Sequence, residues 1–496
     1  MLFNSYIFIF LFLPLALAGY FVLNHFKCYE LGKLFLVGMS LWFYAYFHLS
    51  YLWILLCSIA LNYICHLLLI HRFHTRFTAF AGILLNICIL YYFKYFDFVI
   101  ETINGLTGSH ISVSGVLLPL GISFFTFQQI GFLADSAKGS VDRQKPLDYA
   151  LFVSFFPQLI AGPIVSHEEM LPQFSDISKK RLSAENFYFG LRIFILGLGK
   201  KVLLADTFGQ AVYWGFQHYT ALDGLNTFLV ALFYTLQLYF DFSGYCDMAR
   251  GIGRMFNIQI PVNFLSPYKS ASILEFWDRW HITLTRFFTK YIYIPLGGNR
   301  RGILRTCLNV LFVFCISGLW HGAGWTFLLW GLLHGVFSVL TRLWRILKSR
   351  FIPQALSHPK AQPVLKMFGI LLTFLFLNIS WTLFRAESLS QAGYMLRNIF
   401  TFRGTHIYAE LAGYFQLHEF WYIIKFFHLD ALPYASYYCM FGITAVALVL
   451  IFACRNLHET ESSHRPGLIN TLSLTVLGVW CVLSLSGVST FLYFNF

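Results

Sequence analysis

The stretch from Leu308 to Leu340 constrains the fold more than any other part of the chain, because it is almost wholly apolar yet carries His321 and His334. One continuous helix over this stretch would be about 50 Å long, which exceeds the ~30 Å hydrocarbon core of a bilayer. We therefore expect a break, and Gly322-Ala323-Gly324 is the obvious place. An imidazole at membrane depth beside irregular backbone is a functional-site candidate. A neutral core histidine bonded to a carbonyl would explain the stretch equally well.

The composition predicts an all-α polytopic membrane protein. Of 496 residues, 58% are hydrophobic and only 11% are charged, and apolar blocks recur at the length of a membrane span. We expect about 11–13 transmembrane or re-entrant helices in a single membrane-embedded domain, 1–496, with its core at about 114–345. The expected spans are 6–25, 34–48, 50–70, 78–95, 114–134, 187–214, 225–250, two or three within 306–345, 366–384, 437–454 and 468–494, with a re-entrant piece at 147–165 and an extramembrane excursion at 386–433.

Loop charge indicates the orientation. Basic residues cluster in alternate loops, which places the N-terminus outside and the odd loops in the cytoplasm. The same topology explains the net charge of +13 without nucleic acid. The first apolar block lacks a positive n-region, so we interpret it as a retained span. The basic residues of the odd loops are Lys27, Lys33, Arg72, Arg76, Lys138, Arg143 and Lys145.

The segment 272–291 has apolar residues at helical spacing on one side and charges on the other. We expect one amphipathic helix at the membrane interface, with His281 on the border between its two faces. Interfacial anchoring explains the aromatic stripe, although not the crowding of acids with bases. The stripe consists of Ile273, Phe276, Trp277, Trp280, Leu284, Phe287, Phe288 and Tyr291.

Three clusters of polar residues interrupt the apolar pattern and are candidate sites. The first includes Asp241, Ser243 and Asp247, followed by Arg250 and Arg254; structural pairing is the alternative, because charge at membrane depth is costly. The second includes Arg279, Arg286, Asn299, Arg300, Arg301 and Arg305, which suit an anionic, phosphate-bearing ligand or an anionic lipid. The third is the histidine pair, which would not share a face of one helix.

The remaining chemistry is that of a buried imidazole. The chain has no H-E-x-x-H and no other metal spacing, so we predict no metal site. Its ten cysteines contain no C-x-x-C pair and read as small buried hydrophobes. A G-x-S-x-G elbow is absent too, so a serine-hydrolase mechanism lacks its nucleophile. A histidine acting as general base near neutral pH is what the residues offer.

The chain resembles the membrane-bound O-acyltransferases, specifically the bacterial branch that O-acetylates exported polysaccharides. Each motif alone is weak, but seven in order are highly specific. These are Leu117-Leu118-Pro119-Leu120-Gly121-Ile122-Ser123-Phe124, Phe156-Pro157-Gln158-Leu159-Ile160-Ala161-Gly162-Pro163, Tyr239-Phe240-Asp241-Phe242-Ser243-Gly244-Tyr245, Glu275-Phe276-Trp277-Asp278-Arg279-Trp280-His281, Tyr293-Ile294-Pro295-Leu296-Gly297-Gly298-Asn299-Arg300, Gly318-Leu319-Trp320-His321-Gly322 and Phe384-Arg385-Ala386.

The resemblance implies a family fold with a central catalytic channel through the bilayer and a thioester donor arriving from the cytoplasm. It implies that His321 is the essential catalytic histidine and that His281 is the second sensitive one. Together with the clusters, it suggests a donor- or substrate-binding set: Asp241, Ser243, Arg279, Arg286, Asn299, Arg300, Trp320 and His334.

The leading hypothesis is an inner-membrane O-acetyltransferase that moves acetyl groups toward an exported polysaccharide such as alginate or peptidoglycan. We expect acetyl-CoA as donor substrate, no bound cofactor, and a periplasmic acyltransferase as partner protein. Two alternatives stay open: transfer of D-alanyl groups from a carrier protein to teichoic acid, and a non-catalytic transporter of acyl groups or glycan lipids.

Overall fold

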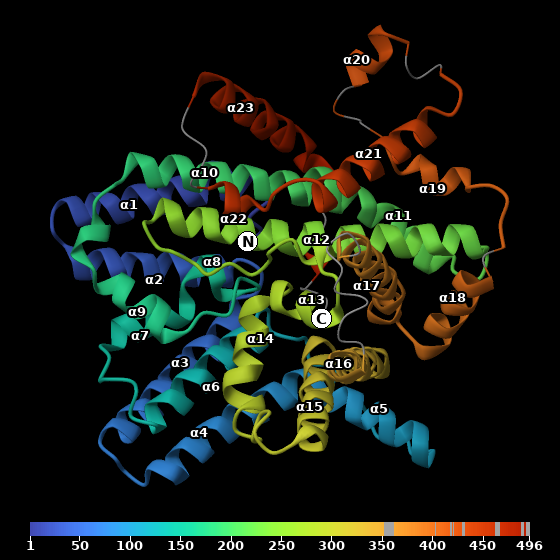
Figure 1. Cartoon of the computed structure of the whole chain (residues 1–496). Helices are drawn as coiled ribbons and strands as arrows, with labels where there is room; N and C mark the ends of the chain where they lie inside the picture. Colours follow the sequence, from blue (N-terminus) through green and yellow to red (C-terminus); the bar gives the residue numbers. More distant parts are fainter. Residues whose placement is uncertain are drawn as a thin grey trace. The chain divides into compact units, whose positions relative to one another are not determined.

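The structure, a computed structural model, describes residues 1–351, 362–401, 403–416, 419, 421–428, 432–461, 467–487 and 491–492. The chain divides into two compact units, and both are helical (Figure 1). Unit 1 contains Met1–Phe194 and Tyr245–Val262, and unit 2 contains Ile195–Gly244 and Asn263–Leu492. The predicted all-α class is confirmed for the described residues, whose one β contact is an isolated bridge between Phe264 and Trp280.

Unit 1 is built from the N-terminal helices, in which α1 packs along α2, and α4 packs on α6. The predicted span 114–134 begins later than expected, because Pro119 and the left-handed Gly121 (φ +72°) precede α6. The predicted span 78–95 is longer than expected, since α4, η2 and α5 follow one another without a gap. The elements are η1 Phe8–Phe12, α1 Leu13–His25, α2 Tyr29–Ala45, α3 Leu49–Ile70, α4 Thr75–Leu90, η2 Tyr91–Tyr95, α5 Phe96–Thr107, α6 Ile122–Ala137, α7 Pro146–Ser154, α8 Phe156–Leu159, α9 His167–Ser175, η3 Ile177–Lys180 and α10 Ala184–Gly199.

Unit 2 carries the three histidines of interest. The long helix α12 begins in unit 2 and its last residues belong to unit 1. The remaining elements are η4 Lys200–Ala205, α11 Asp206–Gln217, α12 Gly224–Met255, η5 Pro267–Lys269, α13 Ile273–Arg279, α14 Ile282–Phe288, η6 Thr289–Tyr293, α15 Ile303–His321, α16 Trp325–Phe351, α17 Gln362–Arg385, α18 Leu389–Thr401, α19 Ala409–Gly413, α20 Trp421–Phe426, α21 Ala435–Phe452, α22 Leu457–Thr460, α23 Leu468–Leu483 and η9 Ser484–Gly487.

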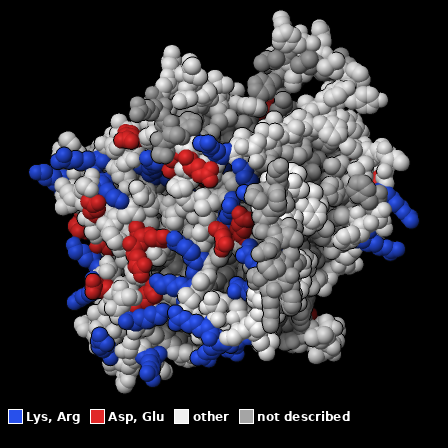
Figure 2. Space-filling view, viewed as in Figure 1, with Lys and Arg blue, Asp and Glu red and all other residues white. Residues whose placement is uncertain are grey.

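Eight helical stretches among the described residues are long and apolar enough to cross a bilayer, which makes the protein polytopic. They are 8–25, 49–70, 75–107, 224–255, 303–321, 325–348, 362–385 and 435–452. Other predicted segments form shorter helices, including α2, α6 and the α7–α8 pair. The predicted excursion 386–433 contains α18, α19 and α20, and parts of it and of the predicted span 468–494 lie outside the described residues. Figure 2, viewed from the same side as Figure 1, shows basic and acidic side chains intermixed on the left of the molecule.

The predicted break after His321 is confirmed. Helix α15 ends at His321, Gly322 is extended (φ −163°), and α16 begins at Trp325. The stretch therefore holds two helices rather than three. The two helices pack against each other, and a Cβ on Gly331 would lie 2.3 Å from the Phe314 carbonyl oxygen. Glycine at this contact lets the two backbones approach closely, as small residues do between membrane helices.

The prediction of one continuous helix over 272–291 is wrong. Helix α13 ends at Arg279, and α14 begins at Ile282 after His281 adopts a left-handed conformation (φ +47°). The cause is tertiary: the backbone of Asn263–Leu265 pairs with this corner, with Leu265 N–H donating to the Arg279 carbonyl (3.0 Å) and Ile282 N–H donating to the Asn263 carbonyl (3.1 Å). The aromatic stripe itself is buried except for Tyr291, which is half-buried.

Candidate active site

His321 lies at the C-terminal end of α15 and is 2% exposed. Its ring is surrounded by other rings: Trp320 at 4.8 Å, Trp330 at 5.1 Å, Phe384 at 5.3 Å and His281 at 6.4 Å between centroids. These neighbours come from α15, α16, α17 and the corner between α13 and α14. Four segments that are distant in sequence therefore converge on one imidazole, all of them within unit 2.

His334 belongs to the neighbouring helix, as predicted, and approaches the same tryptophan. Its ring lies 4.8 Å from that of Trp330. His334 Nε2 lies 3.1 Å from the Ser380 hydroxyl, which donates its own hydrogen to the Leu377 carbonyl (3.0 Å). The direction of the hydrogen bond between this hydroxyl and Nε2 depends on the tautomer of His334. Ser380 thus fixes the orientation of the His334 ring.

His281 is fully buried at the strained corner. A left-handed backbone costs a residue with a Cβ about 1–3 kcal/mol, and such strain gathers at functional sites. The backbone N–H of Thr283, two residues after His281, donates to the Asn263 side chain (3.1 Å). This hydrogen bond holds the corner in place. Burial lowers the pKa of His281 to about 3, so this ring is neutral at physiological pH. It packs edge-on against Phe242 at 4.8 Å.

A cavity of about 320 Å³ approaches the histidines from within unit 2. Its wall includes Ser317, one helical turn before His321, and Ser338, one turn after His334. Trp277 also lines it, and this ring lies 5.3 Å from His334 and 5.9 Å from Trp330. No histidine is among the described residues that line this cavity. Trp277 contacts the His334 ring directly, whereas Trp330 lies between Trp277 and His321. Apolar walls with few convergent polar groups are typical of small-molecule sites.

The charged residues of the cavity wall differ from those that the sequence predicted. Among the described residues that line it, Asp278, Arg342 and Arg345 carry charge. Arg345 also donates to the Ser272 hydroxyl at 2.8 Å. The predicted donor-binding residues lie outside this lining: Arg279 pairs with Glu275 at 2.7 Å, and Arg286, Asn299 and Arg300 are exposed.

The two cavity arginines were missed, although the sequence carries a signal for them. His334, Ser338, Arg342 and Arg345 follow one another at spacings of four, four and three residues. That spacing places all four on one face of α16. A polar stripe that ends in two arginines, on a helix otherwise apolar, would have indicated the cavity.

Asp241 and Ser243 lie buried on α12 of unit 2. Asp241 accepts from Lys201 at 2.7 Å and from the Leu492 amide at 2.9 Å, and Lys201 also pairs with Asp206 at 2.7 Å. The partner lysine was not among the predicted site residues, because its sequence distance from Asp241 conceals the pairing. The Ser243 hydroxyl has no hydrogen-bond partner among the described residues. Asp241 thus carries the structural ion pair that was the alternative reading of this cluster.

The rest of that cluster belongs to unit 1. Arg250 lies 3.4 Å from Asp247, one turn away on α12, and the Arg254 guanidinium lies 4.8 Å from the ring centre of Phe189. Both arginines are therefore engaged by neighbours within their own unit.

A group of metal-ligand type lies in unit 1, where none was predicted. One ligand atom each from Asp135, His167 and Glu168 lies within 4.8 Å of the others. However, His167 Nδ1 faces Asp135 (3.8 Å) while Nε2 faces Glu168 (3.9 Å). Two carboxylates on opposite ring nitrogens hold an imidazole between them, and this arrangement does not aim three ligands at one ion.

Comparison with known proteins identifies the class. The family model described as "MBOAT, membrane-bound O-acyltransferase family" matches residues 36–384. The chain belongs to this family of acyltransferases, as its motifs indicated.

Individual relatives extend the comparison. The chain is 40% identical to "Peptidoglycan O-acetyltransferase" of Helicobacter pylori, over 100% of this chain and 98% of that protein. It is 36% identical to "Probable alginate O-acetylase AlgI" of Pseudomonas aeruginosa, over 83% of this chain and 77% of that protein. A more distant match, at 27% identity over 57% of this chain and 70% of the relative, is "Teichoic acid D-alanyltransferase" of Streptococcus thermophilus.

Proposed function

We propose that this acyltransferase moves an acetyl group from acetyl-CoA, supplied from the cytoplasm, to a hydroxyl group of an exported polysaccharide. The observation that carries the proposal is the position of His321, which ends a membrane helix one turn beyond a cavity-lining serine. A buried imidazole near a small-molecule cavity, with tryptophan rings between the two, supports a role in proton transfer from a hydroxyl nucleophile.

The proposed chemistry needs one base and one leaving group. Neutral His321 removes the proton from the acceptor hydroxyl as the oxygen attacks the thioester carbonyl. The C–S bond then breaks, and the coenzyme A thiolate takes up a proton, so the products are an acetyl ester and free thiol. His281 and His334 act as positioning residues for this ring, with Trp320 as the neighbour on its own helix. Arg342 and Arg345 bind phosphate groups of the donor at the cavity.

The acceptor is proposed to be peptidoglycan. The support is the Helicobacter pylori relative of that name, which aligns over the full chain at the highest identity of the three relatives above. Alginate is the second candidate, supported by the alginate O-acetylases at 35–36% identity. We further propose an inner-membrane location with the N-terminus outside, supported by the loop charges, and a periplasmic acyltransferase that completes transfer to the polymer.

The test is thiol release by the purified full-length protein in lipid nanodiscs, with acetyl-CoA and soluble peptidoglycan fragments supplied. We expect acceptor-dependent release of free thiol in wild type. His321→Ala should lower the rate about 10²–10⁴-fold, the usual contribution of a general base, at unchanged protein level. Arg286→Gln, an exposed residue outside the cavity, is the control. Wild-type turnover in His321→Ala would refute the assignment.

The two alternatives predict different results in the same preparation. D-alanyl transfer requires a carrier protein as donor, so release from a D-alanyl carrier but not from acetyl-CoA would favour it. The "Teichoic acid D-alanyltransferase" relatives support this alternative at lower identity. A transporter would show no thiol release, and vesicles containing it would instead accumulate the labelled substrate.

A further inference from the structure

A groove in unit 1 is larger than the cavity near the histidines and has a different lining. Its volume is about 1400 Å³. Leu13, Leu17 and Phe21 from α1, together with Phe187 and Leu191 from α10, line the apolar part. Helix α1 belongs to a predicted membrane span, so this wall is at the depth of lipid chains.

Three cations lie at one end of the groove. Lys27 follows α1, Lys180 ends η3, and Arg181 comes directly after it; all three line the groove. Lys27 and Arg181 are exposed, whereas Lys180 is only 4% exposed. From Ile9 to His25 the wall formed by η1 and α1 extends about 24 Å along the helix axis at about 1.5 Å per residue. A groove with an apolar length close to a lipid chain and a cationic end thus follows the pattern of a phospholipid.

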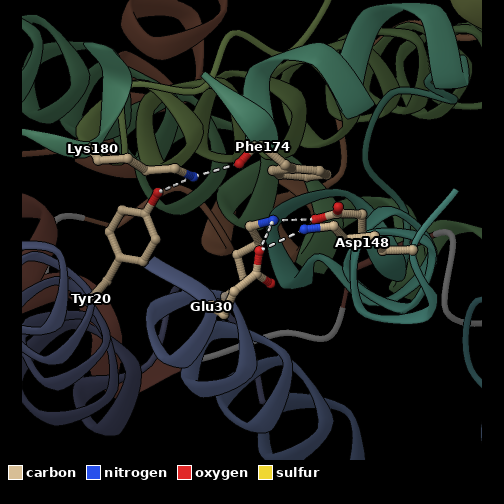
Figure 3. A network of polar contacts seen from close by, with 7 residues as sticks. Tyr20, Glu30, Asp148, Phe174 and Lys180 are labelled. Atoms are coloured by element: carbon tan, nitrogen blue, oxygen red, sulfur yellow. Dashed lines mark hydrogen bonds and ion pairs between the residues drawn. The ribbon is translucent and has the colours of Figure 1, made fainter. Parts of the chain in front are cut away.

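Lys180 differs from its basic neighbours in its partners (Figure 3). Lys33 bonds the Asp148 carboxylate at 2.6 Å, and Lys145 bonds Glu30 at 3.2 Å. Lys180 Nζ instead donates to the Tyr20 hydroxyl (3.2 Å) and the Phe174 carbonyl (2.6 Å), both uncharged. An ammonium has three donors, and the described residues accept two of them. A buried cation of this kind, facing a groove, is incomplete without an anion.

The electrostatics of Lys180 agree with that reading. The pKa of its ammonium is lowered to about 8, first by burial and then by the nearby charge of Lys33, while Asp148, Asp176 and Glu30 raise it by smaller amounts each. A phosphate in the groove would reverse this shift, because an opposite charge favours the protonated form.

We propose that this groove is a binding site for an anionic phospholipid, with the phosphate between Lys27, Lys180 and Arg181 and an acyl chain along α1 and α10. Charge complementarity selects an anionic headgroup over a zwitterionic one, because the three cations face no carboxylate ion pair among the residues described here. The bound lipid belongs to the fold of unit 1, and the proposal does not depend on the acyl-transfer reaction.

The experiment titrates the full-length protein in detergent with palmitoyl-oleoyl phosphatidylglycerol or palmitoyl-oleoyl phosphatidylcholine and counts bound lipid by native mass spectrometry. We expect phosphatidylglycerol to bind about tenfold more tightly, as two or three cations at about 1 kcal/mol each allow. Lys27→Gln with Arg181→Gln should reduce the preference to less than about twofold. Both positions are exposed, so this variant tests the site without removing the buried Lys180.

Two further variants separate the site from general charge. Arg76→Gln with Arg143→Gln removes the same charge from two exposed positions of unit 1, one at the start of α4 and one in a loop, and should keep the preference. Ala18→Trp places a bulky ring in the groove and should reduce binding of both lipids. Equal binding of the two lipids by wild type, an unchanged preference in Lys27→Gln/Arg181→Gln, or displacement of the lipid by coenzyme A would each overturn the proposal.

Discussion

The buried polar groups around Lys33 in unit 1 and around His321 in unit 2 are stabilised in two different ways. In unit 1, Lys33 is buried against the Asp148 carboxylate, so charge is matched by charge. Around His321 in unit 2, the neighbours are tryptophan, phenylalanine and histidine rings. The first arrangement matches a buried charge with an opposite charge, whereas the second surrounds an imidazole with aromatic rings. The first is a structural ion pair, and the second is the candidate active site.

The largest effect should come from breaking the charge pair. Asp148→Asn leaves Lys33 buried with only the more exposed Glu30 as carboxylate partner, at 3.3 Å. Removing one member of a buried pair costs about 3–5 kcal/mol, so thermal unfolding in detergent should shift clearly downward. Lys145→Gln, which removes an exposed contact to the same Glu30, should cost less than about 1 kcal/mol. Equal shifts for the two variants would contradict the assigned role of the pair.

The second prediction tests whether the cavity arginines of unit 2 bind the donor. Arg342→Gln with Arg345→Gln should raise the KM for acetyl-CoA about tenfold and change kcat little, because a charge-assisted hydrogen bond contributes about 1.5–3 kcal/mol to binding. The matched control is Arg279→Gln with Arg286→Gln, which removes the same charge outside the cavity. Steady-state kinetics of thiol release provides the measurement. A larger increase of KM in the control pair would indicate that the donor binds at Arg279 and Arg286, as the sequence suggested.

The pH dependence of stability tests the neutral state of His281. Its folded pKa, about 3, lies below the unfolded value of about 6.5, so protonation favours the unfolded state. Stability is therefore full above pH 6.5 and is lost as the pH falls toward 3, by about 2 kcal/mol at pH 5. His281→Gln should have a smaller difference in unfolding temperature between pH 7 and pH 5 than wild type. An unchanged difference would place the titrating group elsewhere.

The smallest effect concerns the orientation of His334. Ser380→Ala removes one hydrogen bond and should cost about 1 kcal/mol. If the serine positions the imidazole, kcat should fall modestly while the KM for acetyl-CoA stays constant. Ser380→Thr keeps the hydroxyl and should recover the rate. Failure of threonine to recover it, with normal folding, would assign the serine a packing role only.

Much of the fold was readable from the sequence, because long apolar helices and a glycine break are local signals. The end of α15 at His321 followed from length and from Gly322 alone. The corner at His281 was not readable, since its left-handed backbone is imposed by Asn263, a residue outside the amphipathic pattern. Lys201 was not predicted as the partner of Asp241 for a similar reason. An ion pair between different helices produces no periodic pattern in the sequence.

The candidate site was only partly predictable. His321, His281 and Trp320 were identified through motifs, and the structure brings their rings together. Their roles stay predictions, as do those of the remaining predicted site residues. The aromatic neighbours Trp330 and Phe384 lie on other helices, where a lone aromatic within an apolar run is indistinguishable from ordinary core. The cavity arginines were not predicted, because they lie within a long helix, whereas the arginines near Arg300 form a dense run that is easier to recognise in the sequence.

The glycine contact between α15 and α16 has a mechanical consequence. With the Gly331 backbone against the Phe314 carbonyl, neither helix can slide past the other by a turn without driving a side chain into main chain. Helices α15 and α16, which carry His321 and Trp330, therefore form one rigid helical hairpin. If the proposed acyl transfer requires the site to open, the movement must come from another part of the cavity wall, which includes the Trp277 indole.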